Sequence, residues 1–273
     1  MNTLIKFFSL IVVCYAGFLA VLYGYQRQLL YFPPADYYSP QQLNEEGIEE
    51  ILLTTSDGTR LTAWWSPPEI DGQPVVMFFH GNASAVYGYR VVYEAIREAG
   101  FGVWAVSYPG YPGAGGKPGQ EAMVNASIAQ YDYLSGQNIG ADQIAFYGTS
   151  LGAGVAIQLT KHRKPALLIA EAPFNSALDM AQRSFPIVPV SWLLKDQYRS
   201  DVAMQTYDGP LLWLHGTDDS VIPIEQGQTL YDSYSGEKRS LILQGGGHNN
   251  VWESGGAEVI LQELLEMSAS GGS

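Results

Sequence analysis

The sequence predicts an α/β fold built on a mostly parallel, eight-stranded sheet with helices on both faces. The first observation is that short apolar runs alternate with helical segments, as they do in βαβ units. The second is a strand–turn–helix stretch with glycines at the turn, Gln143 to Gln158. The third is the Asp57-Gly58 pair between two early strands, a strong signal for an antiparallel hairpin. The 273 residues are enough for a sizeable core.

The composition is typical of a globular protein. The net charge is −13, from 27 acidic and 14 basic residues, and this balance disfavours nucleic acid as a partner. The single cysteine, Cys14, excludes an intrachain disulfide and assigns no compartment. The four histidines are scattered, and no phosphate- or dinucleotide-binding motif occurs in the right context. We therefore expect no metal and no cofactor, and the sequence gives no indication of oligomeric state.

Residues 1–25 are predicted to form a single-pass transmembrane anchor. Phe7 to Tyr25 is a run of 19 residues without a charge, and as a helix it would span about 28 Å. A cleaved signal peptide is the alternative, although its apolar core is usually shorter and Cys14-Tyr15-Ala16 is a poor cleavage site. Lys6 and the amino terminus outweigh Arg27 slightly, which favours an inside N-terminus and a folded domain on the translocated side.

Residues 26–47 are expected to connect this anchor to a folded domain over residues 48–267. The domain begins with two strands, 48–55 and 60–66, which the Asp57-Gly58 turn joins. The small polar segment 268–273 is predicted to be a flexible tail.

Strands and helices then alternate. The predicted strands are 75–79, 102–106, 143–147, 166–170, 211–214 and 240–243, and the predicted helices are 86–99, 121–134, 151–159, 224–234 and 257–267. Residues 175–207 interrupt this alternation with apolar stretches punctuated by proline, so we expect a small helical cap there.

The most informative motif is Gly148-Thr149-Ser150-Leu151-Gly152. It is the G-x-S-x-G pattern, in the strand–turn–helix context that the pattern requires. A sharp turn lifts the serine side chain clear of the sheet, and the two glycines leave room where a Cβ would collide. The bare pattern arises easily by chance in a chain with 30 glycines, but the flanking strand and helix favour a nucleophilic serine.

Functional residues of parallel sheets lie at the carboxyl ends of the strands. The strand 211–214 is followed by His215-Gly-Thr-Asp218-Asp219, and the strand 240–243 by three glycines and His248. With Ser150, a serine, an acid and a histidine follow three separate strands. That chain order is the one that α/β-hydrolases use.

The chain resembles the α/β-hydrolase superfamily. More narrowly, it is similar to the branch of small, membrane-anchored serine hydrolases that includes serine aminopeptidase-like and depalmitoylating α/β-hydrolase-domain proteins. The resemblance covers roughly residues 27–267. The segments that carry it are Leu29-Leu-Tyr-Phe-Pro33, His80-Gly-Asn82, Tyr108-Pro-Gly-Tyr111, Gly148-Thr-Ser-Leu-Gly152, Ala172-Pro-Phe174, Ser191-Trp-Leu-Leu-Lys195, His215-Gly-Thr-Asp-Asp-Ser-Val-Ile-Pro223 and Gly247-His248. The chain departs at Ser107 and Pro109, where many relatives carry an Asp and an Arg, so a structural ion pair is in doubt.

The resemblance implies a serine hydrolase that cleaves a carboxylic ester or thioester of a small-molecule or lipid-like acyl substrate through an acyl-serine. A serine peptidase or amidase of the same fold is an alternative. A non-catalytic scaffold used for binding is another, although such scaffolds have often lost one of the three residues.

The serine needs a base to take its proton. His248 is the best of the four histidines, because the preceding glycines let its loop reach Ser150. His80 and His215 sit in His-Gly turns that end core strands, where a structural role is expected. His162 lies among basic residues at a helix end, where interaction with the helix dipole suffices.

The histidine needs a carboxylate to fix its tautomer. The residues alone leave Asp218, Asp219 and, less directly, Glu171 as candidates; the family pattern H-G-x-x-D places the acid at Asp219. By family geometry the backbone amides of Asn82 and Leu151 form the oxyanion hole. The Asn82 side chain could instead cap the helix that follows it.

Overall fold

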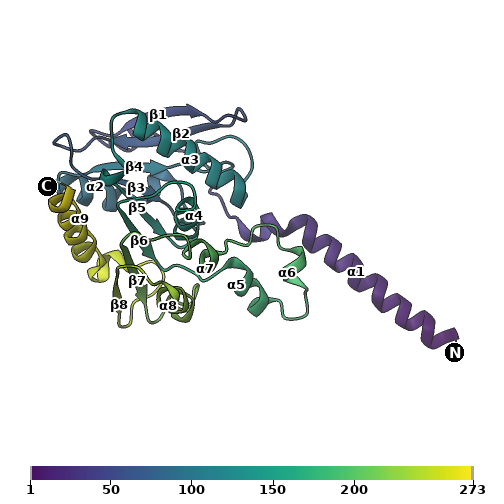
Figure 1. The fold of residues 1–273 in the computed structure, drawn as a ribbon. Helices are drawn as coiled ribbons and strands as arrows, with labels where there is room; N and C mark the ends of the chain where they lie inside the picture. Colours follow the sequence, from purple (N-terminus) through teal and green to yellow (C-terminus); the bar gives the residue numbers. More distant parts are fainter. Residues whose placement is uncertain (1, 272–273) are drawn as a thin grey trace.

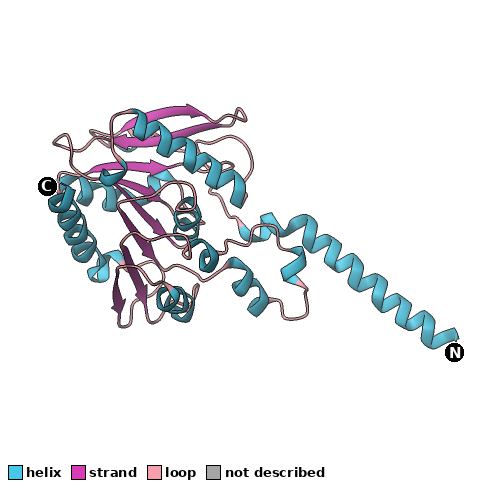
Figure 2. Ribbon diagram, in the orientation of Figure 1, coloured by secondary structure: helices cyan, strands magenta, loops and turns pink. Residues whose placement is uncertain are grey.

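An eight-stranded sheet runs through the domain in the order β1-β2-β4-β3-β5-β6-β7-β8 (Figure 2). The computed structural model describes residues 2–271. The strands are β1 (Glu49–Thr54), β2 (Arg60–Ser66), β3 (Val75–Phe79), β4 (Gly102–Val106), β5 (Ile144–Thr149), β6 (Leu167–Glu171), β7 (Leu211–Gly216) and β8 (Lys238–Leu243). Strand β2 pairs antiparallel with β1 and β4, and all other pairs are parallel. The predicted α/β architecture, with its antiparallel hairpin, is confirmed.

Helices cover both faces of this sheet, and one long helix projects from the domain (Figure 1). The helices are α1 (Asn2–Leu30), α2 (Arg90–Glu98), α3 (Gln120–Gly136), α4 (Leu151–Leu159), α5 (Ala177–Ser184), α6 (Val190–Leu193), α7 (Ser200–Ala203), α8 (Ile224–Ser233) and α9 (Ala257–Gly271), with short turns η1 (Gln41–Leu43), η2 (Val86–Tyr89), η3 (Ala141–Gln143) and η4 (Trp252–Gly256). One buried cluster joins the sheet to α3, α4, α7 and α8, and the other joins it to α2 and α9.

The central strands are apolar throughout because both of their faces are covered. In β3, Met77 and Phe79 belong to the first cluster, whereas Val76 and Phe78 belong to the second. Successive strand side chains point to opposite faces, so a sheet between two helical layers needs apolar residues at every position. This requirement explains why the sequence shows continuous apolar runs there.

The strand–helix turn between β5 and α4 has a left-handed backbone at its central residue. Ser150 has φ 55° and ψ −119°, a conformation that costs free energy for a residue with a Cβ. Close backbone contacts hold it in place: a Cβ on Gly152 would lie 2.0 Å from the carbonyl oxygen of Phe79, and one on Gly148 would lie 2.5 Å from the carbonyl oxygen of Gly152. The two glycines are therefore required by packing.

Three details differ from the sequence expectations. Helix α1 continues past Tyr25 to Leu30, so the start of the expected 26–47 connector is helical. The expected helix 86–99 begins as the turn η2 and becomes α-helical at Arg90. Helix α9 runs to Gly271, so most of the 268–273 segment that we expected to be flexible is helical, while residues 272 and 273 lie outside the described residues.

The expected cap forms between β6 and β7. Its helices α5, α6 and α7 are short, and α5 and α6 lie beside the projecting helix α1 (Figure 1). Ser176 caps α5 by accepting a hydrogen bond from the amide of Asp179, at 2.9 Å, as serine commonly does at this position.

The packing of the turn predicts a marked difference between two glycine-to-alanine variants. Gly152→Ala should lower the free energy of unfolding by about 3 kcal/mol or more, because the new Cβ overlaps β3 backbone that has no room to move. Gly136→Ala, at the end of α3 with nothing within 4 Å of its Cβ position, should change stability by less than about 1 kcal/mol. Urea unfolding of both variants measures this difference, and equal stabilities would contradict it.

Candidate active site

Ser150 and His248 are in direct contact at the carboxyl edge of the sheet. The Oγ of Ser150 lies 3.0 Å from Nε2 of His248. Ser150 directly follows β5, and His248 lies in the loop after β8. The serine side chain thus faces a histidine 98 residues further along the chain, as the sequence predicts.

Asp219 completes a continuous chain of hydrogen bonds. Nδ1 of His248 donates to Oδ2 of Asp219 at 2.7 Å, and the amides of Val221 and Ile222 donate to Oδ1, each at 2.8 Å. Burial opposes ionisation of this carboxyl group, but the hydrogen bonds from His215, His248 and Ile222 outweigh burial and hold its pKa well below the usual range. Asp219 is therefore an ionised acceptor.

The two other candidate carboxylates are placed differently. Asp218 is exposed; its side chain accepts a hydrogen bond from the hydroxyl of Thr217, and its amide donates to the carbonyl oxygen of Gly246. Glu171 is buried and accepts hydrogen bonds from Tyr147 and Thr149. Burial raises the pKa of Glu171. The hydrogen bond to His248 is made by Asp219.

The remaining histidines lie at strand and helix ends. His215 is fully buried; its Nε2 donates to the carbonyl oxygen of Ile222 at 2.9 Å and lies 3.3 Å from the Asp219 carboxylate. It thus has a structural role, as we expected from the sequence, and it supports the loop that presents the acid. Burial lowers the pKa of His80 to about 4, and its Nδ1 donates to the carbonyl oxygen of Gly81 at 2.8 Å. His162 follows α4, where its amide donates to the carbonyl oxygen of Leu159.

Asn82 and Leu151 line the same pocket as Ser150 and His248. The pocket has a volume of about 630 Å³, and its wall is made by the loops after β3, β5, β7 and β8 together with the end of α1 and the cap. Within residues 2–271, none of its lining residues is an Asp, Glu, Lys or Arg. Among the same residues, no group of histidines, cysteines and carboxylates is arranged to hold a metal ion.

The side chain of Asn82 joins this pocket to the end of helix α1. Its Nδ2 donates to the carbonyl oxygen of Leu30 at 2.7 Å, and its Oδ1 accepts from the amide of Phe32 at 2.9 Å. The hydroxyl of Tyr111 donates to the same Oδ1 at 2.7 Å. The side chain thus bonds to a distant segment, and the capping role that we considered from the sequence is not what it performs.

The same end of α1 is fixed to the cap. The guanidinium of Arg27 makes two hydrogen bonds to the carboxylate of Asp196, at 2.8 and 3.1 Å. Gln26 accepts from the amide of Lys195 and donates to the carbonyl oxygen of Leu193, at 2.8 and 3.2 Å. These contacts join residues about 170 positions apart, and no local sequence signal indicates them.

Comparison with known proteins places the chain in a family. No protein-family model matches it. The α/β-hydrolase domain-containing protein WAV2 of Arabidopsis thaliana is 30% identical over 265 residues, covering 87% of this chain and 85% of that protein. The chain belongs to the α/β-hydrolase family. Hydrolysis, as catalysed by esterases and lipases, is therefore the broad class of its reaction.

Other relatives and solved structures agree with this membership. The uncharacterized protein Rv2307c of Mycobacterium tuberculosis is 29% identical over 89% of this α/β-hydrolase and 87% of its own length. The lysophosphatidylserine lipase ABHD12 of Danio rerio is 30% identical, but the match covers 62% of this chain and 49% of that protein. Two solved structures share the fold. The Pyrococcus furiosus esterase Pf2001 is 20% identical, with a TM-score of 0.64 over 86% of this chain and 98% of its own. Est1E from Butyrivibrio proteoclasticus is 18% identical, with a TM-score of 0.66 over 82% of this chain and 100% of its own.

Proposed function

We propose that this α/β-hydrolase cleaves a carboxylic ester or thioester through an acyl-serine intermediate. The observation that carries the proposal is the hydrogen-bond chain from Ser150 through His248 to Asp219. A serine hydroxyl is a weak nucleophile at neutral pH, and a base within hydrogen-bonding distance is what activates it. The serine, the base and the orienting carboxylate here stand in the relation that this chemistry needs.

The reaction follows from these contacts in two halves. In the first, Nε2 of His248 takes the hydroxyl proton while Oγ of Ser150 bonds to the acyl carbon. The tetrahedral intermediate then collapses, and His248 returns the proton to the departing alcohol or thiol. In the second half, a water molecule repeats these steps and releases the acid. We assign the amides of Asn82 and Leu151 to the negative oxygen of each tetrahedral intermediate.

Asp219 sets the direction of proton transfer. As an ionised acceptor it keeps the Nδ1 proton of His248 in place, so Nε2 remains free to accept from Ser150. It also stabilises the imidazolium that forms in each half-reaction. The amides of Val221 and Ile222 hold the carboxylate in position while the charge on His248 changes.

The pocket favours an uncharged acyl group. It carries no charged lining residue, and its apolar wall includes Phe174, Met180 and Phe185. The lipase name of the Danio rerio relative supports an ester substrate of lipid character.

A peptidase or amidase would use the same three residues, Ser150, His248 and Asp219. Turnover of p-nitrophenyl esters, an acyl-thioester and an aminoacyl-amide, measured side by side, separates these possibilities.

We also propose that helix α1 anchors the enzyme in a membrane, with the domain on the translocated side. Among the described residues, one helix, over Thr3–Leu30, is long and apolar enough to span a bilayer, and its most apolar window is not buried in the domain. The proposed orientation rests on the positive charges that flank the charge-free run, because Lys6 and the amino terminus together slightly outweigh Arg27.

Replacing the nucleophile should abolish the chemistry without unfolding the protein. Ser150→Ala should remove labelling by a fluorophosphonate and reduce ester turnover by about 10⁴-fold or more. Gel fluorescence measures the labelling, and circular dichroism checks the fold. Labelling of Ser150→Ala at the wild-type rate would show that another residue is the nucleophile.

The two neighbouring aspartates should differ sharply. Asp219→Asn should reduce kcat by about 10³–10⁴-fold, because an amide no longer enforces the productive histidine tautomer. Asp218→Asn is the matched control; its side chain is exposed, so kcat should fall by less than about tenfold. Steady-state kinetics decide the order, and the reverse ranking would assign the acid to Asp218.

Truncation should separate anchoring from activity. The full chain should sediment with membranes and resist carbonate extraction, because a span of this length inserts almost irreversibly. A chain starting at Gln26 should be soluble and active, since it keeps Arg27, Leu30 and Phe32. A chain starting at Pro33 should lose most activity, because it lacks Leu30 and Phe32, two of the three partners of the Asn82 side chain. Equal kcat values for the two truncated chains would contradict this coupling between the end of α1 and the active site.

Intact mass spectrometry of the natural protein tests retention of the helix, and a mature chain starting near Gly17 would mean a signal peptide.

A further inference from the structure

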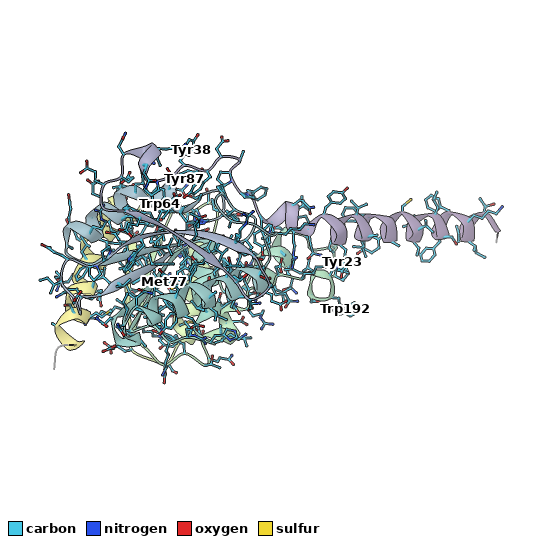
Figure 3. The ribbon with its side chains drawn as sticks, turned by 90° about the horizontal axis from the view of Figure 1, so that it is seen from above. Tyr23, Tyr38, Trp64, Met77, Tyr87 and Trp192 are labelled. Atoms are coloured by element: carbon cyan, nitrogen blue, oxygen red, sulfur yellow. The ribbon has the colours of Figure 1, made fainter. Side chains whose placement is uncertain are left out.

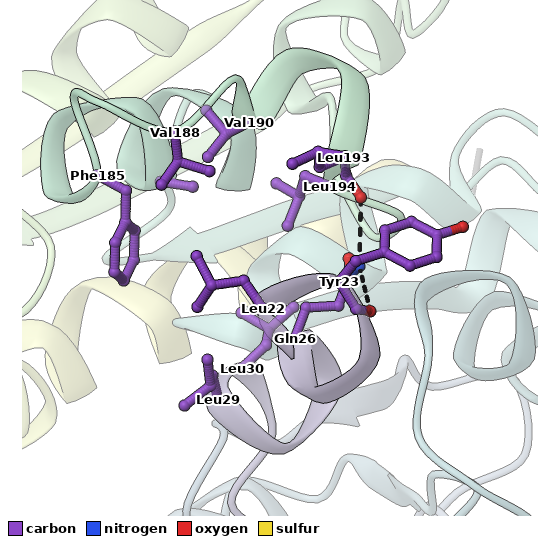
Figure 4. A pocket seen from close by; sticks show the side chains of 11 residues that line it. Leu22, Tyr23, Gln26, Leu29, Leu30, Phe185, Val188, Val190, Leu193 and Leu194 are labelled. Atoms are coloured by element: carbon purple, nitrogen blue, oxygen red, sulfur yellow. Dashed lines mark hydrogen bonds between the residues drawn. The ribbon is translucent and has the colours of Figure 1, made fainter. Parts of the chain in front are cut away.

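An apolar groove separates helix α1 from the cap. The residues that line it all come from the end of α1 or from residues 181–194 of the cap (Figure 4). They are Leu22, Tyr23, Gln26, Leu29, Leu30, Ala181, Phe185, Val188, Val190, Leu193 and Leu194. None of these side chains carries a charge, so the groove suits a hydrocarbon chain better than a polar ligand.

The groove starts beside the end of the charge-free run, at Leu22 and Tyr23, and continues along α1 to Leu30. Besides the Gln26 and Arg27 contacts at its base, the hydroxyl of Tyr15 donates to the carbonyl oxygen of Ile187 at the tip of the cap. Tyr15 lies ten residues before the charge-free run ends at Tyr25, which is about 15 Å along a helix. The cap therefore follows α1 for roughly half of the charge-free run.

The tip of the cap has the composition of a membrane-contacting surface. Residues 185–194 contain no charge, and Arg183 and Lys195 flank them. Ile187 is 73% exposed and Trp192 is 87% exposed. Exposed apolar side chains that gather in one place commonly mark an interaction site. Trp192 lies on the same side of the domain as the projecting helix (Figure 3).

Charged and aromatic groups mark the lower boundary of this surface. The ammonium group of Lys195 lies 4.0 Å from the centre of the Tyr23 ring, and Arg27 lies one helical turn further along α1, paired with Asp196. Tyrosine, lysine and arginine are favoured where hydrocarbon gives way to lipid headgroups. The contact with Tyr15 puts Ile187 on the hydrocarbon side of this boundary, and Trp192 lies close to the boundary itself, next to Leu193, whose carbonyl oxygen accepts from Gln26.

The groove adjoins the pocket over Ser150. Four residues, Leu30, Ala181, Phe185 and Leu194, line both spaces. A chain lying in the groove can thus extend toward the serine without crossing a charged side chain.

We infer that this groove is a side entrance through which the acyl chain of a bilayer lipid passes from the hydrocarbon to Ser150. The inference rests on the proposed serine hydrolysis and on insertion of α1. A lipid held this way keeps its apolar chain out of water along the whole path, so its transfer avoids the free-energy cost of exposing the chain. The bound lipid would be an ester or thioester with a long, uncharged acyl chain.

Two esters with one leaving group test the inference on the full chain in phosphatidylcholine vesicles. 4-Methylumbelliferyl palmitate enters from the bilayer, and 4-methylumbelliferyl acetate enters from water. Val188→Asp puts a charge into the groove and should lower the palmitate-to-acetate ratio of kcat/KM by at least about tenfold. Val188→Trp, which fills the groove without a charge, should lower the same ratio. Val91→Asp is the matched control on α2, where Val91 is 66% exposed, and should leave the ratio unchanged.

The outcomes separate the groove from the chemistry. Ratios within about twofold of wild type in both Val188 variants would overturn the side entrance, as would an equal fall in Val91→Asp. Acetate turnover that is absent in wild type, or that persists in Ser150→Ala, would overturn the proposed hydrolysis, and the entrance would fall with it.

A second measurement tests the depth of the cap. Fluorescence of the full chain in vesicles containing brominated phosphatidylcholine should be quenched in part through Trp192, because bromine quenches indoles that lie in the hydrocarbon. Trp192→Phe should therefore reduce the quenched fraction. An unchanged quenched fraction would place the tip of the cap outside the bilayer and overturn the inference.

Discussion

The arrangement of the site depends on the close approach of two backbones, at Gly152 in α4 and at the end of β3. A Cβ on Gly152 would lie 2.0 Å from the carbonyl oxygen of Phe79 and 2.6 Å from that of His80. This contact presses the start of α4 against the strand that ends in His80-Gly81-Asn82. One packing constraint therefore positions the serine and, beside it, the loop to which we assign half of the oxyanion hole. The strained backbone of Ser150 persists because its surroundings leave no alternative.

Most of the fold could be predicted because the strands of a sheet covered on both faces appear in the sequence as continuous apolar runs. Strands β3 and β4 and helix α4 occupy the predicted residues, since apolar runs bounded by turn residues report burial directly.

The choice between Asp218 and Asp219 could not be made from the residues alone. Both have the same side chain, and only the family pattern separated them. In the structure, the distinction lies in burial and in the amides of Val221 and Ile222, which approach Asp219.

The contacts of helix α1 could not be predicted, because they pair residues that no local pattern relates. In the sequence, Arg27 only flanks the charge-free run, and no motif singles out Asp196 within the expected cap. Two hydrogen bonds join their side chains, which lie 169 positions apart in the sequence. Helix capping was one role that we considered for the Asn82 side chain, since asparagine often bonds locally, but the side chain bonds to Leu30 and Phe32. Pairings of this kind follow from tertiary packing alone.

These contacts bear on how the proposed anchor would act in this hydrolase. A flexible tether would keep the domain near a membrane but leave the orientation of the site free. Here α1 is helical up to Leu30, pairs with Asp196, which is buried, and bonds through its last carbonyl to Asn82. Because an Arg–carboxylate pair with two hydrogen bonds fixes direction as well as distance, the axis of the helix and the position of the site are set together. With α1 in a bilayer, as we propose, the depth and tilt of Ser150 relative to that bilayer would follow from the fold, and the proposed entrance would lie between the helix and the cap.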